Sequence, residues 1–333
     1  MRTETRFPLA LSGAMMLLGV MLSGPCCGQQ TGSAAQYPQR PIRMIVPLAP
    51  GGSVDLLARI LAAKLSASMN QQVIVDNRGG GGGNIAAQSL AQASPDGYTL
   101  MTTISNVVTN PAVNPRVDYD PVRDFTAILL FGSSPFRIVV NPKVPANTIQ
   151  EWFALVKARP GSLNYGSAGS GTGMHLNVER FKILAGVNIV HVPYKGTGPA
   201  TVDLIGGQIQ TMFMGTLSAA PLVKAGRLRA LAVTSLQRRP ETPEQPTVAE
   251  TIVPGFEASE WFGVIGPAGL PKALLGRIHS ELSRAVNHPE TKERLLAEGM
   301  DVLTGTPGEF ADFIKRDLAK WRRVVKETKI TLD

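Results

Sequence analysis

The sequence predicts an α/β fold of two lobes, each built on a mainly parallel, doubly wound sheet, with a hinge of crossing strands. Short apolar strand patterns alternate with amphipathic helical patterns, which is typical of parallel sheets with helices on both faces. The alternation runs through two halves of similar rhythm, 37–130 and 137–255. Two apolar segments, 126–140 and 256–265, are long enough to cross between the halves. Such crossings predict a cleft that closes about a hinge.

The first 35 residues have the pattern of a secretory signal peptide. Two arginines precede an uncharged apolar run over 9–22, and small residues up to Ala35 provide a cleavage site. Cys26 and Cys27 raise a lipoprotein alternative, but Pro25 stands where a lipobox needs cysteine. We therefore expect export to a bacterial periplasm rather than a lipid anchor. Cleavage after Ala35 would leave no cysteine for disulfides or thiol chemistry.

The composition is that of a folded, basic chain. Hydrophobic residues make up 44% and charged residues 17%, which argues against disorder. The formal net charge is +8, but the basic residues are scattered and lack interleaved aromatics, so we expect no nucleic acid partner. A positive field would favour small anions, and ordinary solubility charge is an equally good explanation.

The predicted elements follow one another regularly after the leader. Strands are predicted over 42–46, 73–75, 98–104, 138–140, 163–165, 189–192, 211–214 and 228–234. Helices are predicted over 54–69, 84–93, 148–159, 174–185, 197–206, 217–226 and 271–286, and a capping box at Thr306 and Glu309 opens a last one. The expected organisation is a signal peptide at 1–35, lobe 1 at 36–130, lobe 2 at 131–255, and a return to lobe 1 with C-terminal helices at 256–333.

The loop after the first strand is the first candidate site, because ligands of open α/β sheets bind beyond the carboxyl ends of the strands. Gly51 and Gly52 would let a ligand approach the backbone. Ser53 is predicted as the N-cap of the next helix, and Asp55 falls in its first turn, where the dipole favours a carboxylate. A tight strand–helix connection without a ligand explains the same residues.

The loop 76–86 contains five consecutive glycines. Gly81, Gly83 and Ala86 satisfy a dinucleotide template, but no acidic residue follows about 20 positions on to hold a ribose. We expect no cofactor.

The loop after the strand at 98–104 offers polar side chains that suit either a ligand or an ordinary turn: Ser105, Asn106, Thr109 and Asn110.

The loop at 164–175 resembles the first in kind, with small residues and hydroxyls that lead into a helix. Two such helix starts facing each other would hold a carboxylate at either end of a small molecule.

The sequence gives little support for catalysis. Ser170 matches the hydrolase elbow only when the template is loosened, and the four histidines lack metal-site spacing. His175 lies near the predicted cleft and is better explained as a hydrogen-bonding residue than as a base. We expect no enzyme and no metal.

Seven motifs in register resemble one family. They are Tyr37-Pro38-x-x-Pro41, Pro50-Gly51-Gly52-x-x-Asp55, Asn77-Arg78 with the glycine run, Pro95-Asp96-Gly97-Tyr98, Asp120-Pro121-Val122-Arg123-Asp124-Phe125, Val192-Pro193-Tyr194-Lys195-Gly196 and Gly206-Gly207-Gln208. The chain resembles the Bug-type extracytoplasmic solute receptors, the binding components associated with tripartite tricarboxylate transporters. The resemblance implies a monomeric Venus-flytrap periplasmic binding protein. It would bind a small organic carboxylate and work with membrane permease subunits or, alternatively, a sensor kinase; a hydrolase is the remaining alternative.

The resemblance also implies the ligand-binding residues, which would act largely through backbone N–H groups and ordered waters. Carried over, they are Leu48, Ala49, Gly51, Gly52 and Asp55, with Ser105 and Asn106 nearby, and Ser167, Gly169, Ser170, Thr172 and His175 in the second lobe. Asp55 is expected to hold its loop rather than contact an anion that it would repel.

The chain departs from the family pattern at Gln210 and Met214, where many relatives carry aspartate. Without a carboxylate there, we expect a ligand without a cationic group, either a dicarboxylate or an aromatic carboxylate. The polarizable thioether of Met214 slightly favours an aromatic ring. Filling of core volume is the other explanation for this methionine.

Overall fold

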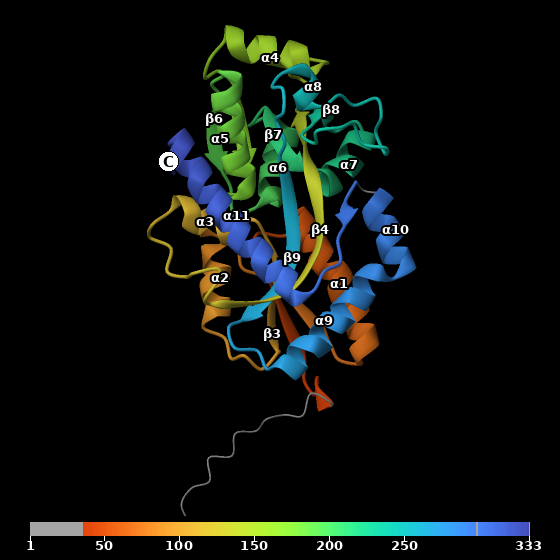
Figure 1. The fold of residues 1–333 in the computed structure, drawn as a ribbon. Coiled ribbons are helices and arrows are strands. Elements are labelled where there is room, and N and C mark those ends of the chain that lie inside the picture. Colours follow the sequence, from red (N-terminus) through yellow and green to blue (C-terminus); the bar gives the residue numbers. More distant parts are fainter. Residues whose placement is uncertain (1–35, 298, 333) are drawn as a thin grey trace, which may run out of the picture. The chain divides into compact units, whose positions relative to one another are not determined.

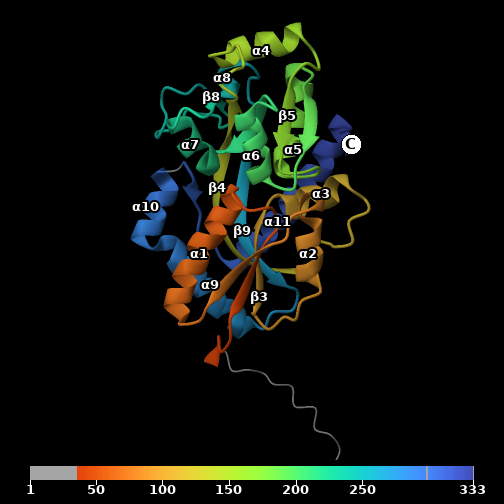
Figure 2. The same cartoon turned by 180° about the vertical axis from the view of Figure 1, so that it is seen from behind.

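The sixteen-residue strand β4 (Phe125–Val140) joins the two halves of the molecule in the computed structural model, which describes residues 36–297 and 299–332. The strand order is β2-β1-β3-β9-β4-β7-β5-β6, and β8 and β10 also pair with β4. Figures 1 and 2 show β4 and β9 running together through the middle, with helices on both sides. The predicted two-lobed α/β fold with crossing strands is confirmed.

We define lobe 1 by the first part of β4 and the elements that pack around it. Its strands are β1 (Ile42–Val46), β2 (Val73–Asn77), β3 (Thr99–Ile104), β9 (Ser259–Pro267) and β10 (Asp301–Val302). Its helices are α1 (Ser53–Met69), η2 (Gly81–Gly83), α2 (Asn84–Ala91), α3 (Asn106–Val113), α9 (Lys272–Asn287), α10 (Pro289–Ala297) and α11 (Pro307–Thr328).

Lobe 2 is defined by the second part of β4 and the elements between β4 and β9. Its strands are β5 (Asn164–Ser167), β6 (Val190–Pro193), β7 (Thr211–Gly215) and β8 (Arg229–Val233). Its helices are α4 (Ile149–Ala158), α5 (Gly173–Ala185), α6 (Thr197–Gly206), α7 (Thr216–Lys224) and α8 (Val248–Thr251).

Strand direction differs between the helix-connected strands and the crossing strands. β1 is parallel to β2 and β3, and β5 is parallel to β6 and β7, as the alternation of strands and helices predicts. β4 and β9 are antiparallel to each other and to their other neighbours, because the chain leaves lobe 1 along β4 and returns along β9. Each sheet is therefore mixed rather than mainly parallel.

An aromatic cluster fills the core of lobe 2. Phe181 is fully buried, and its ring lies 6.1 Å from that of Trp152, 5.4 Å from Phe213 and 5.6 Å from Phe256. Aromatic rings at these separations add favourable edge and stacking interactions to their burial. Phe181 thus fixes α5 to β7 and to the segment that enters β9.

Replacing Phe181 with alanine is expected to lower the free energy of unfolding by about 3–5 kcal/mol, because it removes a buried ring and leaves a cavity. Urea denaturation followed by circular dichroism measures the loss. The control is Val202→Ala, at a side chain that is 69% exposed, which should change the free energy by less than about 0.5 kcal/mol. Equal losses in the two variants would contradict this account of the core.

The helix ends show which local signals determine the fold. The capping box that opens α11 is confirmed, since Thr306 Oγ1 accepts from the Glu309 N–H at 3.2 Å and Glu309 Oε2 accepts from the Thr306 N–H at 2.7 Å. The prediction that Ser53 caps α1 is wrong. Gly52 is the N-cap, and the Ser53 hydroxyl donates instead to Ser218 Oγ at 3.1 Å.

Three α-helices of the described residues were not predicted, namely α3, α8 and α10. α3 contains Pro111 and a run of polar residues, and α10 follows α9 after a single residue. The signal peptide and the cysteine pair lie outside the described residues, and the lobe boundaries at 130 and 255 stay predictions.

Across 36–297 and 299–332, no helix combines the length and the apolar character that a membrane span requires.

Candidate functional site

The carboxyl ends of the parallel strands of both lobes meet at one region. In lobe 1, β1, β2 and β3 lead into α1, α2 and α3, and in lobe 2, β5, β6 and β7 lead into α5, α6 and α7. Each of these helices begins at the strand ends that meet there. The first turn of a helix has N–H groups without intrahelical partners and a partial positive charge. The region therefore favours a bound anion.

Direct hydrogen bonds hold the two lobes together at this region. The Ala49 N–H donates to the Lys195 carbonyl at 3.0 Å, and the Ser53 hydroxyl reaches Ser218 across the same boundary. We call the loops that meet here the interlobe contact; they are 47–53, 79–84 and 105–110 in lobe 1, and 167–175, 194–198 and 215–218 in lobe 2. The lobes are closed on each other in this structure.

Glycine permits this close approach at two positions above all. A Cβ atom on Gly198 of lobe 2 would lie 2.0 Å from the Pro50 carbonyl oxygen of lobe 1. A Cβ atom on Gly82 of lobe 1 would lie 2.3 Å from the Ser170 carbonyl oxygen of lobe 2, and the φ angle of Gly82 is +62°. Neither position accepts a side chain without separation of the lobes.

Asp55 holds the first loop in place. Its carboxylate accepts from the Gly51 N–H at 3.0 Å, from Asn77 Nδ2 at 3.0 Å and from the Arg59 guanidinium. Burial opposes its ionisation, but the hydrogen bonds from Arg59, Gly51 and Asn77 together lower the pKa of Asp55 below its ordinary value. These contacts support the expectation that Asp55 orders the loop. Leu48 and Gly52 beside it are buried.

Three buried polar atoms near the end of β3 make no hydrogen bond within the described part of the chain. Ser105 Oγ and Asn106 Oδ1 follow β3 directly, and Asn84 Oδ1 lies at the start of the neighbouring helix α2. The Asn106 Nδ2 group donates to the Gly82 carbonyl at 2.9 Å, which fixes the orientation of its amide. Buried polar atoms are nearly always paired with protein, water or ligand. These three atoms are therefore candidates to contact a ligand or ordered water in the interlobe contact.

The hydroxyls of the lobe 2 loop shape the loop itself. Ser167 Oγ accepts from the Gly169 N–H at 3.1 Å and lies 2.7 Å from His191 Nε2. Thr172 caps α5, since its Oγ1 accepts from the His175 N–H at 3.4 Å and donates to the Gly169 carbonyl at 2.7 Å. Backbone groups of this loop, rather than the two hydroxyls, face the opposite lobe.

The side chain of His175 is buried, and its contacts hold the lobe 2 loop in place. Its Nδ1 accepts from the Gly171 N–H at 3.2 Å, and its ring stacks on His191 at 4.0 Å. The ring of His191 stacks in turn on Tyr165 at 4.9 Å. Among the residues that the structure describes, no three histidine, cysteine, aspartate or glutamate side chains form a group suited to a metal ion.

The two positions that depart from the family pattern differ in location. Met214 is 1% exposed in the core of lobe 2, near the end of β7 that leads into the interlobe contact. Gln210 precedes the opposite end of β7, where Oε1 accepts from the Asn164 N–H at 2.9 Å and Nε2 donates to the Gly207 carbonyl. Gln210 therefore lies away from the contact.

Sequence reasoning missed the loop at 194–198 and Ser218 as parts of the site. The signal for the loop was present, since Gly196 and Gly198 flank the start of α6 much as Gly51 and Gly52 precede α1. Ser218 carries no such signal. Its role is visible only through its contact with Ser53, 165 positions away in the sequence.

Comparison with known proteins identifies the family. A family model described as the tripartite tricarboxylate transporter family receptor matches residues 57–330. The chain belongs to this family. BugT of Bordetella pertussis is 36% identical over 298 residues, which cover 89% of this chain and 91% of BugT. The predicted membership of the Bug-type receptors is confirmed.

Solved structures of similar proteins have the same fold. The periplasmic binding protein BugD is 33% identical with a TM-score of 0.86, over 89% of this chain and 99% of that one. Rpa4515 of R. palustris, determined with adipate, is 33% identical with a TM-score of 0.85 over the same shares. MatC of Rhodopseudomonas palustris, with bound malate, is 29% identical with a TM-score of 0.83, over 87% of this chain and 100% of MatC. The family and these neighbours are solute-binding proteins.

Proposed function

We propose that the protein is an exported receptor that captures a small organic carboxylate between its lobes and presents it to the permease of a tripartite tricarboxylate-type transporter. The observation that carries this proposal is the meeting of six helix starts, three from each lobe, at the interlobe contact. Their dipoles and first-turn N–H groups create an anion site from main-chain atoms. Family membership supports the assignment of a solute to this site.

The same geometry accounts for recognition without a dedicated cation. Asp55, the carboxylate nearest the first loop, is neutralised by Arg59 and by its other hydrogen bonds, so it does not repel an anion. Ser105 Oγ and the amide oxygens of Asn84 and Asn106 remain for the polar groups of the ligand or for bridging waters. Backbone and amide groups of this kind distinguish one ligand from another by where its polar atoms lie rather than by its charge.

A dicarboxylate is the ligand class that we favour. Helix starts from opposite lobes would each take one carboxylate, so a ligand with two acidic ends bridges the lobes and stabilises the closed state. Adipate and malate, the ligands of the two structural neighbours, are both dicarboxylates. The methionine at 214 provides no carboxylate for an ammonium group, which argues against an amino acid. An aromatic carboxylate is the alternative.

Closure follows from the crossing strands. β4 and β9 are the continuous elements between the lobes, so rotation about them opens or closes the interlobe contact. The ligand contacts both lobes only when they are closed, and it therefore shifts the population towards the closed state.

Thermal unfolding of the purified protein against a panel of mono-, di- and tricarboxylates, aromatic acids and amino acids tests the proposal. A dicarboxylate at about 100 times its Kd should add about 2.7 kcal/mol to the stability of the native state, which gives a clear rise in Tm. Amino acids and carboxamides should give no rise. Absence of a shift with every carboxylate, after unfolding and refolding to remove any co-purified ligand, would overturn the proposal.

A further inference from the structure

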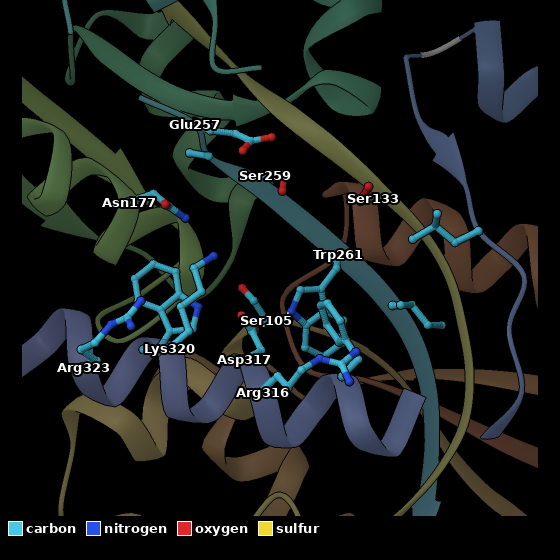
Figure 3. Close-up of a pocket in the computed structure, with 15 residues that line it drawn as sticks. Ser105, Ser133, Asn177, Glu257, Ser259, Trp261, Arg316, Asp317, Lys320 and Arg323 are labelled. Atoms are coloured by element: carbon cyan, nitrogen blue, oxygen red, sulfur yellow. Dashed lines mark hydrogen bonds between the residues drawn. The ribbon is translucent and has the colours of Figure 1, made fainter. Parts of the chain in front are cut away.

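A cavity borders the interlobe contact, with which it shares Ser105, and lies between α11, the crossing strands and α5 (Figure 3). Its volume is about 500 Å³, within the range of small-molecule sites. The floor is formed by Ser133 of β4 and by Ser259 and Trp261 of β9, and α11 forms one wall. Asn177 of α5 contributes from lobe 2, so both lobes border this cavity. We call it the α11 cavity.

Three basic side chains of α11 line the α11 cavity. Arg316, Lys320 and Arg323 are spaced four and three residues apart, which places them on one face of the helix. Figure 3 shows all three extending from α11 at the edge of the cavity. Within the described ranges, neither Arg316 nor Lys320 forms an ion pair, and the pair of Arg323 with Glu327 is long, at 4.0 Å, and exposed. The cations are therefore available to an anion.

The acidic residues of the α11 cavity do not cancel these charges. Asp317 is 8% exposed and its Oδ2 accepts from Trp261 Nε1 at 2.9 Å. Burial raises the pKa of Asp317 above its ordinary value, although that hydrogen bond and the nearby Lys320 oppose the rise. Glu257 is exposed at the opposite rim. Three cations thus face one buried, hydrogen-bonded carboxyl and one solvated carboxylate.

Aromatic side chains form the inner surface of the α11 cavity. Trp261 and Trp321 are nearly buried, and Phe313 meets Trp261 edge-on with ring centres 5.6 Å apart. The hydroxyl of Ser105 also lines the cavity and makes no hydrogen bond of normal geometry, although it lies beside the Glu260 carboxylate. Cations at the rim and aromatic rings inside together suit an organic acid with an apolar body.

We propose that the α11 cavity, which lies next to the interlobe contact, is a second binding site for a small aromatic carboxylate whose acidic group pairs with Arg316 and Lys320. Its ring packs against Trp261 and Trp321. The site borders both crossing strands and both lobes, so its occupancy and the closure of the lobes influence each other, and each ligand alters the affinity for the other. The proposal goes beyond the proposed function and does not depend on it.

Fluorine NMR of protein labelled with 5-fluorotryptophan tests the proposal, with benzoate as the probe. The chain has three tryptophans, of which Trp261 and Trp321 line the α11 cavity and Trp152 lies in the core of lobe 2. Benzoate should shift the resonances of Trp261 and Trp321 with saturation and leave that of Trp152 unchanged. The double variant R316Q/K320Q should weaken this binding at least tenfold.

Matched variants separate the α11 cavity from its alternatives. R322Q/K326Q removes the same charge at the same spacing from exposed positions of α11 outside the cavity, and it should change benzoate affinity less than twofold. G198A, which alters the interlobe contact, should leave benzoate bound to the α11 cavity. Failure to saturate, equal weakening in both double variants, or loss of all binding in G198A would each overturn the proposal. The dicarboxylates of the panel test the interlobe contact separately.

Discussion

Replacement of Gly198 with alanine is expected to weaken ligand capture by at least tenfold while both lobes stay folded. The added Cβ atom would lie 2.0 Å from the Pro50 carbonyl oxygen in the closed state. The obstructing atom belongs to backbone, which cannot move aside as a flexible side chain would. All three of the atoms nearest to that Cβ belong to lobe 1, so the open lobes accommodate it. Each tenfold loss of affinity corresponds to about 1.4 kcal/mol.

Calorimetric titration with the tightest carboxylate of the panel measures the loss. The matched control is Gly206→Ala in the same helix, where an added Cβ atom meets nothing within 4 Å. Both changes replace glycine in a helix and should raise helix stability by a similar amount, up to about 1 kcal/mol. Small-angle scattering provides a readout without ligand, in which G198A should be the more open protein. Normal affinity and a normal scattering profile in G198A would contradict the role given to this glycine.

Replacement of Glu260 with glutamine is expected to stabilise the protein above neutral pH. Glu260 is 6% exposed on β9, where its Oε1 accepts from the Ser105 N–H at 2.9 Å. Burial raises its pKa to about 7, and the negative charge of Asp317 adds to the rise, whereas hydrogen bonds from Ser105 and Trp261 oppose it. Glutamine has nearly the same shape and retains an oxygen for the Ser105 N–H.

The pH dependence follows from the difference between the folded and unfolded pKa values of Glu260. Below about pH 4.5 both states hold the proton, so the group contributes no pH dependence. As pH rises from there to about 7, the unfolded chain releases the proton and the folded chain keeps it, which favours unfolding. Over that window the wild type loses about 3 kcal/mol that the E260Q variant keeps.

Urea denaturation of both proteins between pH 4.5 and 8 measures this difference. The stability of E260Q relative to the wild type should increase with pH through the window and level off above it. Glu257→Gln removes an exposed carboxyl from the adjoining segment and serves as the control for overall charge. A gain of the same size in both variants, or a gap that does not change with pH, would remove the basis for a raised pKa at Glu260.

The helices and strands could be predicted mostly where apolar periodicity is strong. β1 covers the predicted range, and α1 and α6 agree with their predictions to within one residue. α3 was not predicted because its polar residues are buried by contacts with other segments. Thr109, for example, donates to the Gly171 carbonyl of lobe 2 at 2.7 Å. Such a contact gives no periodic signal, because its partner is distant in the sequence.

The candidate site was predictable as a set of loops but not in atomic detail. The glycines at 51 and 52 and the helix starts that follow the strands were sufficient to select the loops after β1, β3 and β5, but not the loop at 194–198. The choice of Gly52 over Ser53 as the N-cap depends on Ser218, which only the closed fold places nearby. Likewise, the side chain of Met214 is compatible with a cleft wall or a core from sequence alone, and its burial is decided by the packing around β7.

The main-chain character of the interlobe contact has a consequence for divergence. The bond from Ala49 to Lys195 joins an amide to a carbonyl, groups that every residue but proline possesses. Mutations that exchange these side chains leave the bond intact, whereas Gly82 and Gly198 tolerate almost no exchange. Closure is thus encoded by main-chain groups and by these two glycines. A duplicated gene could therefore acquire a new solute by drift at the remaining positions, without first rebuilding the movement that captures it.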